Sequence, residues 1–246
     1  MNLLLNDSYA PITSEIGFIK CPASTVVKAF VEWQSKIYAD SERRLKIESS
    51  QFYGDLSQAL DKLLPITSPE RQRQLFIQTA GDWTAYFDNG KLGTDSAPVV
   101  STLCRKLGCE GVRAAHIPHT LDEEEGTKKG QYGATIFEIY GPQQTDFLNI
   151  VRSVCLGYDG GRWSFSATGT EQSFESVDVY KSKLMKDRFT PEMLNSYLQA
   201  MGINMFDASY YESNDGCYLV EKIGATLSNM KSFSLKEIRQ SLGLNQ

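Results

Sequence analysis

The stretch from Trp83 to Gly108, WTAYFDNGKLGTDSAPVVSTLCRKLG, constrains the fold most, because it places a strand, a glycine-marked loop and a helix in direct succession. Its first six residues have the aromatic and apolar content typical of a strand. Pro98 suits the first turn of a helix, and apolar residues follow it at helical spacing. Gly108 is the expected C-terminal end of that helix. The chain therefore combines strands and helices within a short span.

The same reading of periodicity along the chain predicts a sheet flanked by helices. The glycine turn at 159–161 predicts a hairpin, so the strands between 112 and 174 are expected to be mainly antiparallel. The expected helices lie at 22–38, 56–64, 177–185, 190–201 and 234–242. The expected strands lie at 15–20, 45–49, 74–79, 83–88, 112–117, 132–140, 150–158, 162–167 and 218–223. Residues 1–14 are expected to form an irregular arm. We predict an α+β protein with a mixed, largely antiparallel sheet.

The length and composition are those of one globular domain covering residues 1–246. A chain of 246 residues with 41% apolar residues can bury a single core, and we see no linker, repeat or low-complexity segment. A net charge of −5 argues against a nucleic-acid partner, which needs a basic face. The five dispersed cysteines contain no CxxC pair and fit free thiols in a reducing cytosol. With no signal peptide and no long apolar run, we expect a cytoplasmic protein without a membrane segment.

The loop between the strand and the helix is the first candidate site. A helix N-terminus can bind an anion, but Asp88 and Asp95 flank this one and would repel a phosphate. The glycine spacing is that of neither a P-loop nor a dinucleotide-binding fingerprint. Two interpretations stay open: a capped helix entry with a glycine turn, or a polar surface loop, braced by Trp83 and Tyr86, that contacts a partner.

The other groups of candidate residues give weaker evidence for a functional site. His116 and His119, followed by acidic residues, could bind zinc, but the intervening Pro118 and the spacing favour ordinary histidines at a strand end. No GxSxG motif marks a serine nucleophile, and Cys104 lies on the apolar face of its helix. Arg162 and Arg188 lie in short basic-aromatic clusters that suit salt-bridged element ends. We therefore predict no metal site and no cofactor.

Four segments carry a resemblance to a known family: WTAYFDNGKLGTD with the LCRKLGC helix, FEIYGP at 137–142, VRSVCLGYDGGRWSFSATG at 151–169, and KDRFTPEML at 186–194. Over about the middle half of the chain, this pattern resembles an uncharacterised family of bacterial intracellular proteins. The resemblance implies a bacterial, intracellular protein. It implies no activity and no catalytic residue.

Our first functional hypothesis is a non-catalytic protein of the immunity or antitoxin type, which binds a toxin domain and occludes it. Exposed acidic residues would cover a basic active site and speed association with it. The residues predicted to bind the protein partner come from the central loop, the acidic stretch and the two arginine clusters. They are Trp83, Tyr86, Asp88, Asn89, Asp95, Asp122, Glu123, Glu124, Glu125, Arg162 and Arg188.

The alternative is a hydrolase-like enzyme for small molecules, with a carboxylate-based cleft around residues 83–95. Asp88 or Asp95 would be the acid or base, and Arg162 or Arg188 would hold an anionic substrate. A deep pocket that joins these residues, with a strongly raised carboxylate pKa, favours the enzyme, and a shallow surface favours the binding protein. A third hypothesis is a homodimer that uses the exposed edge of the sheet.

Overall fold

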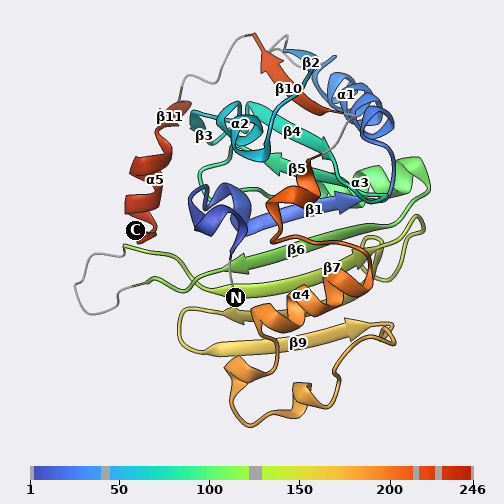
Figure 1. The fold of residues 1–246 in the computed structure, drawn as a ribbon, viewed down its shortest axis with the longest axis vertical. Coiled ribbons are helices and arrows are strands. Elements are labelled where there is room, and N and C mark those ends of the chain that lie inside the picture. Colours follow the sequence, from blue (N-terminus) through green and yellow to red (C-terminus); the bar gives the residue numbers. More distant parts are fainter. Residues whose placement is uncertain (1–2, 40–44, 122–128, 213–215, 225–228, 245–246) are drawn as a thin grey trace.

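The fold is built around one nine-stranded sheet in the computed structural model, which describes residues 3–39, 45–121, 129–212, 216–224 and 229–244. The strand order is β2-β10-β4-β5-β1-β6-β7-β8-β9, and each neighbouring pair is antiparallel (Figure 1). These strands are β1 (Glu15–Ile19), β2 (Lys46–Phe52), β4 (Arg73–Gln78), β5 (Thr84–Asp88), β6 (Gly111–Ile117), β7 (Ala134–Tyr140), β8 (Ile150–Tyr158), β9 (Trp163–Gly169) and β10 (Cys217–Ile223). A small second sheet pairs β3 (Ile66–Ser68) with β11 (Lys231–Phe233).

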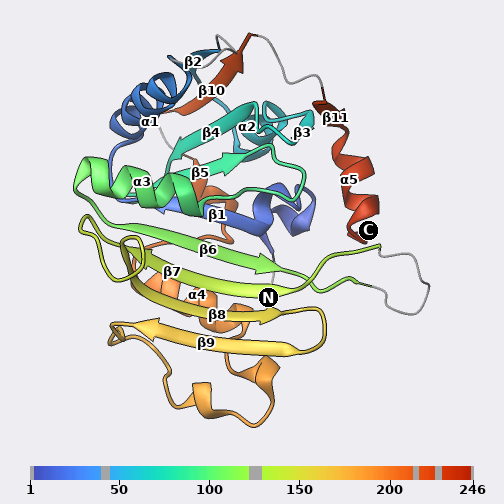
Figure 2. The ribbon, with the colours of Figure 1, turned by 180° about the vertical axis from the view of Figure 1, so that it is seen from behind.

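Helices cover both faces of the large sheet. On one face, α1 (Ala23–Ala39) packs against β2, β10 and β4, and α3 (Ala97–Leu107) packs against β1, β6 and β7. The two helices also pack against each other, as Figure 2 shows. On the other face lie α2 (Leu56–Asp61) and α4 (Pro191–Ala200), and α5 (Leu235–Ser241) lies beside the small sheet. The prediction of an α+β protein with a largely antiparallel sheet flanked by helices is confirmed.

Successive side chains of each strand point to opposite faces of the sheet, and this divides the interior into two apolar clusters. In β4, Leu75 and Ile77 face α2, whereas Phe76 faces α1 and packs its ring 5.1 Å from that of Phe30. The central strands are buried on both faces, and β1 and β5 have every residue buried. At β9 only one face of the sheet is covered by other parts of the chain. Ser164 and Ser166 are exposed, while Phe165 between them is partly buried.

The structure corrects three sequence-based boundaries. The helix expected at 177–185 is wrong: the segment forms two 3-10 turns, Val179–Lys181 and Met185–Asp187. Ser182 between them is extended, with φ −53° and ψ 141°, and its carbonyl oxygen accepts a hydrogen bond from Arg188 Nε. The arm at 1–14 is not irregular throughout, since it contains 3-10 turns at Leu4–Asp7 and Ile12–Ser14. The expected strand at 45–49 extends to Phe52.

A buried ion pair fastens the segment after β9 to the sheet. Arg152 of β8 and Glu175 have side chains that are 2% and 0% exposed, and Arg152 Nη2 lies 2.6 Å from Glu175 Oε2. Glu175 also accepts hydrogen bonds from Arg152 Nε, from the Tyr180 hydroxyl and from the backbone N–H of Gln172. Such a pair costs desolvation of both charges, so breaking it by removing one partner leaves an uncompensated buried charge.

We predict that Arg152→Leu lowers the free energy of unfolding by about 3–5 kcal/mol, because Glu175 then stays buried without its cation. Urea denaturation measures this change. The control is Lys20→Ala, which breaks the exposed pair with Glu110 and should cost at most about 1 kcal/mol. The double variant Arg152→Leu/Glu175→Leu should recover part of the loss. Equal costs for Arg152→Leu and Lys20→Ala would contradict the prediction.

Candidate functional site

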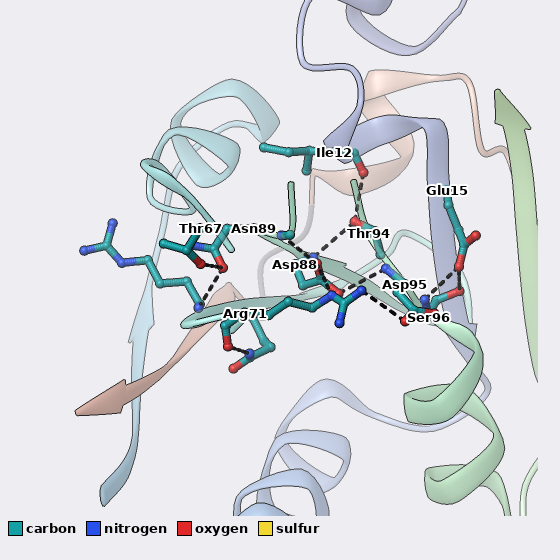
Figure 3. Close-up of polar contacts among 12 residues, drawn as sticks. Ile12, Glu15, Thr67, Arg71, Asp88, Asn89, Thr94, Asp95 and Ser96 are labelled. Carbon is teal, nitrogen blue, oxygen red and sulfur yellow. Dashed lines mark hydrogen bonds and ion pairs between the residues drawn. The ribbon is translucent and has the colours of Figure 1, made fainter. Parts of the chain in front are cut away.

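The loop between β5 and α3 is organised around the carboxylate of Asp88, which is 0% exposed. Its Oδ1 accepts the backbone N–H of Gly90 at 2.9 Å, and its Oδ2 accepts the N–H of Asp95 at 3.1 Å. Arg71 Nε forms an ion pair with Oδ1 at 3.2 Å (Figure 3). The Tyr86 hydroxyl donates to Oδ2 at 3.1 Å. The loop and its neighbours therefore already use both oxygens of this carboxylate.

A second buried carboxylate holds the start of α3. Glu15 comes from β1, and its Oε1 accepts hydrogen bonds from Ser96 N at 2.7 Å and from Ser96 Oγ at 2.9 Å (Figure 3). With Asp95 N donating to Asp88, protein carboxylates occupy the anion-binding position at this helix N-terminus. The exclusion of a phosphate cradle, expected from the sequence, thus has a direct structural reason.

The rest of the loop is tied to the N-terminal arm. Thr94 Oγ1 accepts a hydrogen bond from Asp88 N at 3.1 Å and donates to the carbonyl oxygen of Ile12 at 2.9 Å. Gly93 has φ +93°, and a Cβ at this position would collide with the carbonyl of Pro11. The glycine is therefore needed both for its backbone conformation and for the close approach of the two segments.

Most of the loop residues predicted to touch a partner lie below the surface. Trp83 and Tyr86 are 2% exposed, and the indole Nε1 of Trp83 donates to the carbonyl oxygen of Met201 at 3.2 Å. Asn89 is 0% exposed and joins β4 to the residue before β3, donating to Pro65 O at 2.8 Å and accepting from Arg73 N at 3.0 Å. Together with Asp88, these side chains shape the loop rather than present a contact surface. The side chain of Asp95 is 44% exposed and is available to a ligand or partner.

The two arginines of the predicted cleft lie far from the two aspartates along the sheet. Arg162 is exposed in the turn before β9, which is separated from β5 by β1, β6, β7 and β8. Arg188 is half-buried, with its guanidinium 6.0 Å from the ring centroid of Phe165 on β9. A cleft that combines either arginine with Asp88 and Asp95 is therefore not formed.

The structure brings together an aromatic cluster that the sequence reading missed, formed by His119, Tyr132, Tyr158 and Trp163. Tyr158 lies at its centre, with ring centroids 4.4 Å from His119, 5.8 Å from Tyr132 and 5.7 Å from Trp163. Tyr132 is 48% exposed. Tyr158 and Trp163 are directly opposed in the β8–β9 pair, so the hairpin turn between them was the signal that could have found this contact.

The aromatic cluster stands where the chain enters and leaves the acidic stretch. Thr120 N donates to Gln131 O at 3.1 Å, and Gly133 N donates to His119 Nδ1 at 3.2 Å, which holds the two stems together. The predicted binding residues Asp122, Glu123, Glu124 and Glu125 themselves lie outside the described residues.

The histidines do not form a metal centre with neighbouring ligands in the part of the chain that the structure describes, where no group of three suitable side chains gathers. His116 Nδ1 lies 3.4 Å from Thr135 Oγ1, and burial lowers the pKa of its imidazole below the usual value. Burial therefore favours the neutral form of His116.

Compared with protein-family models, curated proteins and solved structures, the chain matches none. The resemblance to a bacterial family therefore stays a prediction. Among the described helices, none has both the length and the apolar content that a bilayer crossing requires.

We predict a pH-dependent stability cost at Asp88, because burial raises the pKa of its carboxyl group from 3.8 to about 6 against the opposing attraction of Arg71. Between these values the folded protein retains the proton that the unfolded chain has lost. The free energy of unfolding of the wild type, relative to Asp88→Asn, should therefore fall by about 3 kcal/mol as the pH rises from 3.5 to 7. Urea denaturation of both proteins across this range measures it. A difference that is constant or rises with pH would contradict the prediction.

Proposed function

We propose that this chain is a non-catalytic bacterial protein of the immunity or antitoxin type, which acts in the cytoplasm by binding a toxin domain and occluding its active site. The observation that carries this proposal is the aromatic cluster of His119, Tyr132, Tyr158 and Trp163 at the stems of the acidic stretch. Aromatic rings supply contact area and carboxylates supply charge, and a protein that covers a basic active site needs both.

The aromatic cluster has the composition of a binding hot spot. Tyrosine, tryptophan and arginine dominate the energetics of protein interfaces, where a few anchors carry most of the affinity. Tyr132 is 48% exposed, Tyr158 and Trp163 are half-buried, and Arg162 is exposed in the adjoining turn. Lys186 lies in the 3-10 turn Met185–Asp187, and its Nζ is 5.1 Å from the ring centroid of Trp163. This contact helps to hold the Trp163 ring in position. These rings are thus pre-ordered before a partner arrives.

The charge of the acidic stretch supports partner binding at the same surface. The sequence places Asp122, Glu123, Glu124 and Glu125 directly after Leu121, between stems that are held together by hydrogen bonds. Carboxylates at such a position would attract a basic partner over a distance and raise the association rate, with a dependence on salt. The net charge of −5 acts in the same direction.

The second candidate, a hydrolase-like enzyme with a carboxylate cleft, is favoured by the raised pKa of Asp88, about 6, which lies in the range of a general acid or base. A catalytic carboxylate must also reach the proton that it transfers. Asp88 is 0% exposed and already receives hydrogen bonds from two backbone amides and the hydroxyl of Tyr86. We therefore place the binding protein first.

The test uses the product of the neighbouring gene in the native host, expressed with and without this chain. The proposal expects a stoichiometric complex, rescue of growth from toxicity, and a loss of at least about 30-fold in affinity for Tyr132→Ala, corresponding to about 2 kcal/mol. The matched control is Tyr53→Ala, which removes a tyrosine that is 71% exposed elsewhere and should leave affinity unchanged. Charge reversal at Glu123 and Glu124 should slow association and weaken its salt dependence. Equal effects of Tyr132→Ala and Tyr53→Ala would exclude the aromatic cluster as the binding surface.

A further inference from the structure

A surface hollow of about 190 Å³ lies between α1, the start of α3 and the strands β4, β5 and β10. Its lining includes the side chains of Phe30, Trp33, Gln34, Arg71, Gln74 and Asp95. We propose that this hollow is a binding site for a small zwitterion, a molecule of amino-acid size that carries one ammonium and one carboxylate group. This inference goes beyond the proposed function and does not depend on it.

An unpaired acceptor is the first sign of a ligand. Gln74 is 3% exposed, and its Nε2 donates to the carbonyl oxygen of Arg71 at 2.9 Å, whereas its buried Oε1 has no hydrogen-bond partner among the described residues. A buried acceptor without a partner costs about 1–3 kcal/mol. An N–H group of a ligand in the hollow would remove this cost.

A second amide in the hollow points the same way. Gln34 is 8% exposed, and no hydrogen bond joins its side chain to a described residue. It interrupts the otherwise apolar buried stripe of α1, formed by Val26, Val27 and Phe30. Buried polar groups are normally paired, so the unpaired Gln74 Oε1 points to a bound molecule, and Gln34 offers a second amide to it from the wall of the hollow.

The charges in the hollow select a ligand with both signs. Arg71 directs Nε to Asp88 and Nη2 to Asp95, at 3.2 Å and 3.0 Å, so Nη1 is left to bind a carboxylate. The side chain of Asp95 is 44% exposed and can accept from an ammonium group, as can Gln74 Oε1. Lys222 and Glu70 also line the hollow, and they form an ion pair with each other at 2.7 Å. A ligand with both charges offers a partner to Asp95 and to Arg71 at once, which an ammonium or a carboxylate alone does not.

The remaining wall is aromatic and limits the size of the ligand. The rings of Phe30 and Trp33 meet edge to face at 5.8 Å, and Tyr86 lies behind Phe30 at 6.4 Å. Trp33 is half-buried and can pack against a short side chain or an ammonium group. Drug-sized ligands need roughly 300 Å³ or more, so a hollow of about 190 Å³ suits a smaller molecule.

The hollow is separate from the aromatic cluster. It lies on the face covered by α1 and α3, where Phe30, Phe76 and Tyr86 form one apolar cluster. Trp163 packs instead against the other apolar cluster, on the face covered by α4. A zwitterion in the hollow would therefore leave the proposed protein-binding surface uncovered, and each site can be tested without the other.

The experiment is isothermal titration calorimetry of the full chain with L-alanine and L-serine, and separately with ethylamine and acetate, which each carry one of the two charges. The proposal expects the amino acids to bind with a dissociation constant of about 1 mM or tighter, and ethylamine and acetate at least about 10-fold more weakly. Lack of binding of both amino acids would overturn it, and so would equal binding of ethylamine, which would mark a simple cation site.

Variants locate the binding. Asp95→Asn keeps the shape of a half-exposed side chain and should weaken amino-acid binding at least about 10-fold, and Gln74→Leu, which removes the unpaired acceptor, should do the same. Glu110→Gln, at an exposed carboxylate outside the hollow, is the control and should bind as the wild type does. Circular dichroism verifies folding, and Trp33→Leu replaces any variant that does not fold. Wild-type binding by all hollow variants would place the ligand elsewhere and overturn the proposal.

Discussion

Two buried carboxylates, Asp88 and Glu15, hold the centre of this protein together. They accept the backbone amides that open α3, and each is held in turn by an arginine: Arg71 lies 3.2 Å from Asp88, and Arg113 lies 2.8 Å from Glu15. Arg113 also pairs with Glu138 at 3.2 Å, so the charged row runs across β1, β6 and β7. Buried charges are tolerated only when they are paired, and a slip in strand register would separate these pairs.

This arrangement decides where binding can occur. The helix N-terminus, which in other proteins receives an external anion, is filled here by carboxylates of the chain itself. The side chains best placed for recognition lie at its margins. Asp95 and Arg71 open toward the hollow on the α1 face, and the rings around Tyr158 stand at the stems of the acidic stretch. Arg71 thus links the core network to the hollow, and the aromatic cluster forms a separate surface.

Much of the fold follows from the sequence because periodicity and turn residues are local signals. The helix after Pro98, its end at Gly108 and the hairpin at 159–161 all form as expected. The helix expected at 177–185 does not form, because Ser182 is extended and Arg188 binds its carbonyl oxygen, a contact that apolar spacing does not encode. The three-residue strands β3 and β11 are too short to show a period.

The candidate site was harder to predict because its partners are distant in sequence. Turn-forming residues predicted the loop, but not that Asp88 would be buried by Arg71 or that Glu15 would cap Ser96 across 81 positions. The sequence does not show whether a polar side chain in a turn faces solvent or forms hydrogen bonds with the backbone of its own loop. The aromatic cluster had one local signal, the facing of Tyr158 and Trp163 across the hairpin, while His119 and Tyr132 join it only through the tertiary fold.

Asp88 is buried, and the backbone amides of Gly90 and Asp95 donate to its carboxylate. Carbon-13 nuclear magnetic resonance of the aspartate side-chain carboxyl groups, followed across pH together with these amide signals, tests both statements. We expect the carboxyl of Asp88 to titrate with a raised pKa of about 6 and the amide signals of Gly90 and Asp95 to shift with the same midpoint. Titration near 3.8, without a matching shift of those amides, would instead show an exposed carboxylate that these amides do not bind.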